Sequence, residues 1–184
     1  MDFVAEPKPF LLVKLICGII AGEESVFKRA KEKLVHLYGQ FDLESVTFTF
    51  DFTDYYAKQM GEDLKRRFLS FERLLSPETL SKIKIETNKL EDEIKEELGS
   101  GSRIVNLDPG YLTPSSLIMA TAKNFAHRVP LQNGIYAHLE FLFAKDEVRT
   151  LDWTYPDYKT EDYQNFFLDV RRAYLSQLKK EAER

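Results

Sequence analysis

Apolar and polar positions alternate along this chain with periods that predict separate elements. Leu11 to Ala21 is a nearly continuous apolar run bounded by Gly22, which is typical of a buried central strand. Apolar side chains recur at helical spacing from Ser25 to Tyr38, and Gly39 is a natural helix end. From Leu43 to Phe52 apolar and polar residues alternate strictly, which predicts a strand with one buried face.

The middle of the chain predicts a strand, a helix and a second strand. Lys65 to Leu75 carries enough apolar residues for a strand. Ser76-Pro77-Glu78 then begins a helix that continues to Leu98, because serine caps free backbone donors and proline suits the first turn. Ile104 to Leu107 predicts a short strand that ends in a turn at Asp108-Pro109-Gly110.

The last third of the chain predicts a helix, a meander of strands and a final helix. The hairpin signal is the dipeptide Asn133-Gly134. The predicted ranges are a helix from Pro114 to His127 capped by Thr113, strands at Val129–Leu131, Ile135–Ala144 and Val148–Leu151, and a helix from Glu161 to about Lys180.

The first six elements follow the order β-α-β-β-α-β, which is that of ferredoxin-like folds. We therefore expect an α+β fold with a mainly antiparallel sheet, helices on one face, and a C-terminal meander and helix. A mixed α/β sheet is the competing arrangement. A length of 184 residues predicts a single domain, with residues 1–9 as a flexible lead-in.

Composition narrows the classes of function. The net charge is -4, so we expect no general nucleic-acid binding. Cys17, in an apolar run, is the only cysteine, which excludes an internal disulfide and predicts a core residue. The apolar run from Phe10 to Ile20 contains Lys14 and is too short to span a bilayer, so we expect a cytoplasmic protein without membrane contact.

Charged residues flank the connection between the second and third predicted strands. Asp51 and Asp54 could share a metal ion such as magnesium if the chain turns between them, or they could cap a turn. Lys65 and Arg67 share one strand face and Arg66 the other, which suits a phosphate or carboxylate ligand. The competing interpretation is that these acids and cations pair with each other.

A second group of candidates follows the fourth predicted strand. Asp108 and Tyr111 lie on a loop that could present a helix N-terminus to a ligand. Lys123 and His127, four residues apart, would share a helix face, and Arg128 follows. This set offers a proton-transfer group and anion-binding cations, although cations also favour a helix C-terminus for electrostatic reasons.

Other residues are interpreted as structural. His36 lies in the first helix, and His138 lies beside Glu140 on the outer strand face, where we expect both histidines to be surface or structural residues. The aromatic loop from Trp153 to Tyr158 predicts a packed cover before the last helix. The chain contains no phosphate-loop or dinucleotide fingerprint, and one cysteine with three scattered histidines disfavours a zinc site. The sequence therefore assigns no cofactor.

Six segments, taken in order, resemble an uncharacterised prokaryotic family, the domain of unknown function 4416. They are DFTDYY (51–56), KRRFLSFERL (65–74), NLDPGYLT (106–113), AKNFAHR (122–128), GIYAHLEF (134–141) and WTYPDY (153–158). The resemblance implies a stand-alone cytoplasmic domain and supplies no catalytic residues. Members are sometimes labelled GTP-binding, a label that the missing phosphate loop and the missing N-K-x-D motif do not support.

Two hypotheses follow from the sequence. In the first, the chain binds, and could act on, a small anionic ligand such as a nucleotide or phosphorylated metabolite. Asp54 and His127 would be its catalytic candidates, and the other charged residues named above would bind the ligand. In the second, the chain is a non-catalytic interaction or scaffold domain whose aromatic loop and exposed sheet face contact a partner or a second copy.

Overall fold

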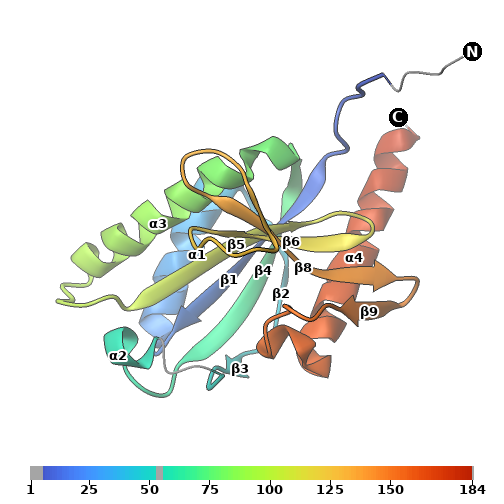
Figure 1. The fold of residues 1–184 in the computed structure, drawn as a ribbon. Helices are drawn as coiled ribbons and strands as arrows, with labels where there is room; N and C mark the ends of the chain where they lie inside the picture. Colours follow the sequence, from blue (N-terminus) through green and yellow to red (C-terminus); the bar gives the residue numbers. More distant parts are fainter. Residues whose placement is uncertain (1–5, 53–55, 184) are drawn as a thin grey trace, which may run out of the picture.

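The computed structural model of the chain describes residues 6–52 and 56–183 (Figure 1). Short 3-10 turns at Pro77–Thr79 and Asp157–Lys159 precede α3 and α4. The helices and strands are β1 (Val13–Ala21), α1 (Glu24–Tyr38), β2 (Phe41–Glu44), β3 (Phe48–Thr49), α2 (Ala57–Met60), β4 (Lys65–Leu75), α3 (Leu80–Glu97), β5 (Val105–Leu112), β6 (Ser116–Thr121), β7 (Arg128–Pro130), β8 (Tyr136–Ala144), β9 (Glu147–Thr150) and α4 (Glu161–Ala182).

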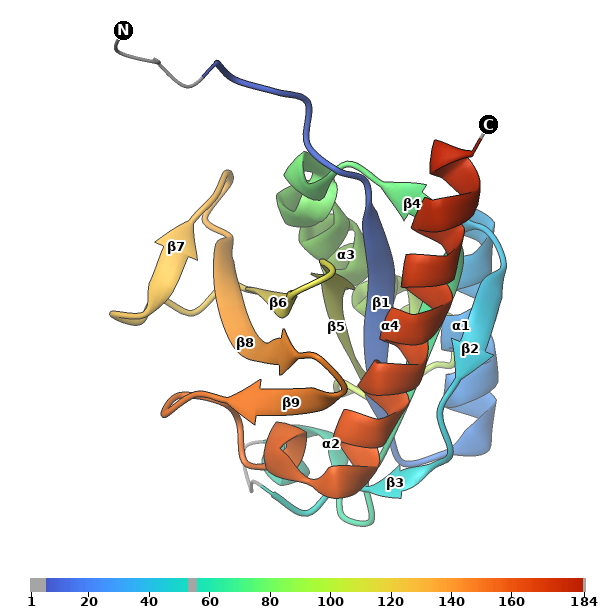
Figure 2. The same ribbon diagram turned by 90° about the vertical axis from the view of Figure 1, so that its right-hand side faces the viewer.

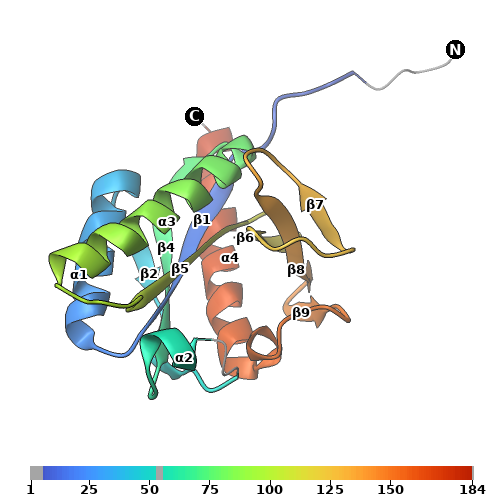
Figure 3. The same ribbon diagram turned by 60° about the vertical axis from the view of Figure 1, so that its left-hand side comes forward.

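The strands form one antiparallel sheet in the order β2-β4-β1-β5-β6-β8-β7, with β3 beside β4 and β9 beside β8. Its first four strands have the ferredoxin-like arrangement, so the predicted α+β class is confirmed. Helices α1 and α3 cover one face as predicted, and α4 covers the opposite face (Figures 2 and 3). Among the described helices, none is long and apolar enough to cross a membrane.

Strand β1 is buried on both faces because helices lie on both sides of it. Leu15, Cys17 and Ile19 pack with the buried side chains of α1 and α3. Ile16 points the other way and packs with Phe68 of β4 and with side chains of α4. The nearly continuous apolar run in the sequence follows from this double burial. The prediction that Cys17 is a core residue is confirmed, and burial raises the pKa of its thiol.

Several other predictions are confirmed. Strand β4 has the predicted bounds, and α1, α3 and α4 begin and end near the predicted residues. Asn133 and Gly134 both have positive φ angles, 57° and 74°, as the predicted hairpin turn requires. The predicted cap at Ser76 is wrong in detail, because its hydroxyl donates to the Glu78 carboxylate rather than accepting from the helix backbone.

The single strand predicted from Leu43 to Phe52 is wrong, because the structure divides this segment into β2 and β3. Both strands pair with β4, but the chain advances four residues from Glu44 to Phe48 while β4 advances three, from Leu69 to Arg66. Ser45 takes up the extra residue: its N–H donates to the Phe68 carbonyl, and its hydroxyl accepts from the Phe68 N–H, both at 2.9 Å. A side chain thus replaces part of the backbone ladder.

The turn predicted at Asp108-Pro109-Gly110 is also wrong, because β5 continues through it to Leu112. Pairing of β5 with β6 begins only at Gly110, so no β5–β6 pair involves Pro109, which has no N–H. A Cβ atom at Gly110 would lie 2.5 Å from Met119 Sδ and 2.6 Å from the Ile118 carbonyl oxygen. The glycine therefore permits close approach of two strands rather than a turn.

The helix predicted from Pro114 to His127 is wrong, and with it the cap assigned to Thr113. Ser116–Thr121 forms β6, which pairs with β5 on one side and β8 on the other. Leu117 packs beside Phe141 toward α4, whereas Ala120 packs beside Leu80 of the α3 side. Because both faces of β6 bury apolar groups, the sequence lacks the alternation that marks a half-exposed strand.

Candidate functional site

A cavity of about 470 Å³ lies where β5 and β6 diverge. These strands pair only between Gly110–Leu112 and Leu117–Met119, and beyond that point both line the cavity. The remaining walls come from α3, the β3–α2 segment, β8 and the loop before α4. The lining residues are Phe50, Phe52, Tyr56, Arg66, Lys84, Asn88, Arg103, Asn106, Asp108, Met119, Ala120, Thr121, Ala122, Lys123, His138, Glu140, Tyr155, Pro156, Asp157 and Tyr158.

Side chains of α3 replace a strand partner along the open edge of β5. The Leu107 N–H donates to Glu91 Oε1 at 2.7 Å, and Lys84 Nζ donates to the Leu107 carbonyl at 2.7 Å. Arg103 donates to Glu91 Oε2 at 2.5 Å. Burial raises the pKa of Glu91, although Lys84 and Arg103 oppose the shift. These contacts satisfy the backbone of β5 and hold two cations at the cavity wall.

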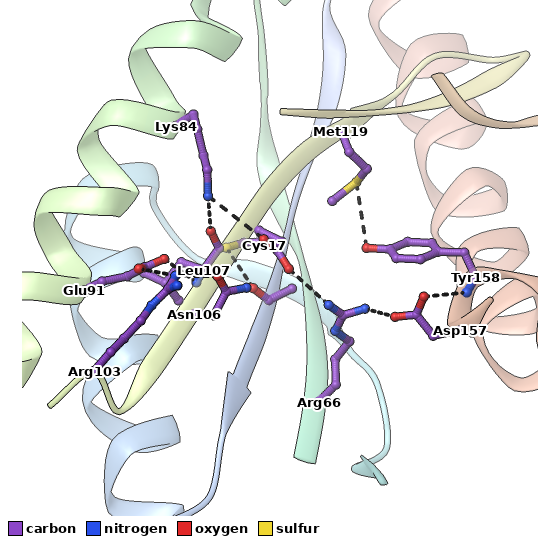
Figure 4. Close-up of polar contacts among 12 residues, drawn as sticks. Cys17, Arg66, Lys84, Glu91, Arg103, Asn106, Leu107, Met119, Asp157 and Tyr158 are labelled. Atoms are coloured by element: carbon purple, nitrogen blue, oxygen red, sulfur yellow. Dashed lines mark hydrogen bonds and ion pairs between the residues drawn. The ribbon is translucent and has the colours of Figure 1, made fainter. Parts of the chain in front are cut away.

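Arg66 of β4 lies at the centre of the floor, with 4% of its surface exposed. Its NH2 group lies 3.0 Å from Asp108 Oδ2, and its NH1 group pairs with Asp157. The guanidinium carbon lies 4.6 Å from the centroid of the Phe50 ring. Figure 4 shows Arg66 between Asp157 and the group formed by Lys84, Asn106 and Arg103. Burial raises the pKa of Asp157, and Arg66 opposes that shift.

Buried polar atoms without a hydrogen-bond partner concentrate at this cavity. Of the five such side-chain atoms in the described part of the chain, four belong to cavity-lining residues: Arg66 Nε, Asn106 Nδ2, His138 Nε2 and Glu140 Oε2. The last two lie 3.0 Å apart, an ion-pair distance without hydrogen-bond geometry. Asn106 Oδ1 accepts from Arg103, which leaves the Asn106 amide donor without a partner among these residues.

A second polar group, the histidine cluster, borders the cavity from β7 and β8. It contains His127, Arg128, His138, Glu140 and Tyr155. Arg128 Nε donates to His138 Nδ1 at 3.2 Å, which places the remaining ring proton on Nε2, facing Glu140. Arg128 also donates to the Tyr155 hydroxyl at 2.6 Å. Of the two interpretations of His138, surface or structural, the surface one is wrong, because β6 and β7 flank this residue and leave 1% of it exposed.

His127 lies at the outer side of this cluster. Its Nε2 atom is 3.2 Å from His138 Nδ1, and its ring stacks on Trp153 with centroids 5.0 Å apart. Desolvation lowers the pKa of His127, and the neighbouring His138 and Arg128 lower it further. These surroundings therefore favour the neutral imidazole of His127 over the charged one. The predicted helical spacing of Lys123 and His127 is wrong, because both follow β6 in a loop.

The structure divides the residues that the sequence suggested as a site. Arg66, Asp108 and Lys123 line the cavity, while His127 and Arg128 reach it through His138. The others lie elsewhere: Asp51 in a separate groove, Lys65 exposed on β4, Arg67 in contact with Glu24, and Tyr111 in a small apolar cluster with Leu80. Asp54 lies outside the described residues. No group of three potential metal-ligating side chains occurs in residues 6–52 and 56–183.

Several lining residues had no role in the sequence interpretation, including Lys84, Asn106, Glu140 and Asp157. For Lys84 a signal exists: it follows Leu80 by four residues and precedes Glu91 by seven, so two charged residues share the inner side of α3. Asn106 and Asp157 carry no such signal. Their position depends on the divergence of β5 from β6 and on the loop that leads into α4.

Comparison with known proteins gives one match. The model of a family described as Domain of unknown function (DUF4416) matches residues 11–174. No match was found among curated proteins or among solved structures. The match covers every element that lines the cavity, but its description names no activity or ligand.

Proposed function

Because the chain belongs to the DUF4416 family, whose description assigns no activity, we propose a function from the cavity itself. The chain binds a small anionic ligand, such as a nucleotide or a phosphorylated metabolite, between β5 and β6. A volume of about 470 Å³ suits a small molecule, since ligand cavities commonly measure about 300–1,000 Å³.

The buried amide of Asn106 is the observation that supports this proposal most directly. Only 3% of the residue is exposed, and its Nδ2 donor has no hydrogen-bond partner in the described residues. A buried donor without a partner is destabilising by about 1–3 kcal/mol, so such groups are rare unless a ligand or water satisfies them. An acceptor oxygen on a bound ligand would satisfy this one.

Cations around Asn106 favour an anionic acceptor. Lys84 of α3 and Arg103 of the segment before β5 flank it, and Arg66 lies across the floor (Figure 4). Lys84 has three N–H donors, one of which binds the Leu107 carbonyl, and its Nζ lies 4.0 Å from Asp108 Oδ1. Charge-assisted donors of this kind bind phosphate and carboxylate oxygens more strongly than neutral donors do.

One observation favours the alternative, a protein-interaction domain. Phe125, Val129, Leu131 and Trp153 are exposed apolar residues around β7, which is the last strand on that side of the sheet. This surface could pair two copies of the chain. The alternative predicts a dimer in analytical ultracentrifugation that Val129→Asp dissociates, together with no ligand-induced stabilisation.

The ligand proposal is tested by a thermal-shift screen with nucleotides and sugar phosphates. A ligand at about 100 times its Kd should raise the melting temperature by ~5–10 °C. In Asn106→Asp the isosteric side chain keeps the oxygen that accepts from Arg103 and replaces the amide donor by a carboxylate oxygen. Because that oxygen repels an anion, we expect affinity to fall at least ~10-fold.

Arg67→Gln is the matched control, since Arg67 is adjacent in sequence to Arg66 but contacts Glu24 outside the cavity. The control should respond to the ligand like the unmodified chain. The proposal is wrong if no anionic compound stabilises the unmodified chain, or if Asn106→Asp folds and binds the hit with unchanged affinity.

A further inference from the structure

The cavity combines buried charged groups with exposed aromatic rings, and its lining also includes the buried apolar residues Phe50 and Met119 and the exposed polar residues Asn88 and Lys123. Its floor carries buried polar and charged groups: Arg66, Lys84 and Asn106 are 4%, 7% and 3% exposed. Its rim carries aromatic rings, with Phe52 40% and Tyr155 41% exposed. Charged groups are normally exposed and large aromatic groups normally buried, so the three buried polar residues and the two exposed rings are the features that indicate what the cavity binds.

Tyr155 is held in place as a flat platform at the rim. Its ring stacks on His138 with centroids 5.2 Å apart, and its hydroxyl accepts from Arg128 at 2.6 Å. Its backbone N–H donates to Glu140 Oε1 at 2.7 Å. A side chain fixed by two contacts, on a backbone fixed by a third, loses little conformational entropy when a ligand stacks against it.

Phe52 also lies at the rim of the cavity, but it comes from a different part of the sequence. It follows β3, whereas Tyr155 precedes α4, so the two rings come from segments about a hundred positions apart in the sequence. The Phe52 ring lies 6.4 Å from that of Phe50, whose other neighbours include the guanidinium of Arg66. Phe50 therefore lies between the exposed ring of Phe52 at the rim and the guanidinium of Arg66 at the floor.

We propose that the cavity binds its ligand in one orientation, with the anionic group at Asn106 and Lys84 and a flat unsaturated ring against Phe52 and Tyr155. This inference rests on the proposed function and narrows it to a ligand class. The ligand is an anion that carries a planar ring, as nucleotides do, and not a bare sugar phosphate. Aromatic stacking supplies the preference for the ring, and the floor donors supply the preference for the charge.

The test compares two probes that share a charged group and differ in the ring. Isothermal titration measures the Kd of adenosine 5′-monophosphate and of ribose 5-phosphate, and three further nucleoside monophosphates extend the comparison to other bases. We expect the best nucleotide to bind at least ~10-fold more tightly than ribose 5-phosphate. Phe52→Ala and Tyr155→Ala should remove most of that ratio.

Two variants separate stacking from other effects. Tyr155→Phe keeps the ring and loses the hydroxyl, so it should keep the ratio, whereas Asn106→Asp should weaken both probes together. Leu37→Ala, an exposed apolar residue of α1 outside the cavity, is the control for removing surface apolar area.

The outcomes distinguish this inference from the function on which it rests. If ribose 5-phosphate binds as tightly as every nucleotide, or if Phe52→Ala and Tyr155→Ala leave the ratio unchanged, the ring site is wrong and the anion site stands. If neither probe nor any other anion binds, the proposed function is wrong and the ring site with it.

Discussion

Two buried cations on the α4 side of the sheet, Lys14 and Arg66, have similar burial but different surroundings. Both come from central strands, and both pair with carboxylates. Lys14 is fully buried, and Gln177 of α4 accepts from it at 2.7 Å. Arg66 lies on the floor of the cavity, where β5 and β6 diverge.

Their carboxylate partners differ as well. Asp42, the partner of Lys14, is 22% exposed in its side chain and also accepts from the Ser70 hydroxyl at 2.6 Å. Asp157, the partner of Arg66, is 7% exposed in its side chain. A buried ion pair alone is therefore a poor marker of a site, because the Lys14 pair lies beneath a helix, and what distinguishes the Arg66 pair is the open space beside it.

The largest expected effect tests how much Arg66 contributes to stability. Arg66→Met leaves the buried carboxylate of Asp157 without a cation and leaves Asp108 with only Lys84, 4.0 Å away. We therefore expect the free energy of unfolding, measured in urea, to fall by about 3–5 kcal/mol. Arg67→Met, one residue along the strand, removes a pair whose partner Glu24 is 69% exposed in its side chain. Arg67→Met should lower the free energy of unfolding by about 1 kcal/mol or less.

A double variant shows whether the lost cation is the cause. Asp157→Asn removes a charge that Arg66→Met leaves unpaired, so the double variant should be more stable than Arg66→Met alone. Equal effects of Arg66→Met and Arg67→Met on the free energy of unfolding would contradict the distinction between a buried and a surface pair.

An intermediate effect is expected for Lys14→Met. Methionine has a similar length and fits under α4, while Asp42 keeps the Ser70 hydroxyl and partial contact with water. The free energy of unfolding should fall by about 1–3 kcal/mol, measured by the same urea titration. Ligand affinity should not change, since Lys14 does not line the cavity. A loss as large as that for Arg66→Met would remove the contrast between the two cations.

The fold was predictable from the sequence where an element buries a single face, because its apolar residues then recur at a regular spacing. The helical stripes of α1 and α4 follow directly from such patterns, whereas β4 was predicted from its apolar content alone. The segments from Asp108 to His127 were not predictable in this way. Pro109 and Gly110 of β5 have the sequence signal of a turn, although Gly110 in fact permits β6 to approach closely. Strand β6 is buried on both faces, so its sequence lacks the alternation of a half-exposed strand.

The site was predictable only in part. Strand alternation separates Arg66 from Arg67, but the sequence does not show which of them is buried. That depends on Asp157, which is 91 positions away in the chain and reaches Arg66 through the loop before α4. The role of Asn106 is likewise not predictable from the sequence, because its unpaired donor results from the geometry of two diverging strands and not from any local motif.

The smallest effect concerns the pH dependence of the carboxylates that bind Arg66 and Arg67. Burial raises the pKa of Asp157 above its ordinary value of 3.8, so the folded chain binds this proton more tightly than the unfolded chain does. Its contribution to stability is complete below the ordinary pKa and is lost as pH rises through the raised value. Asp157→Asn should therefore lower the free energy of unfolding less at pH 7 than at pH 4.

Glu24, the partner of Arg67, should show the opposite sign. The hydrogen bond from Arg67 lowers its pKa below the ordinary value of 4.5, so its contribution is present above that value and is lost as pH falls through the lowered one. Glu24→Gln should therefore be more costly at pH 7 than at low pH. Urea titrations of both variants between pH 3 and pH 7.5 measure how the loss of unfolding free energy in each variant changes with pH, which gives one slope for each. Slopes of the same sign would mean that pairing with arginine, and not desolvation, controls Asp157 as well.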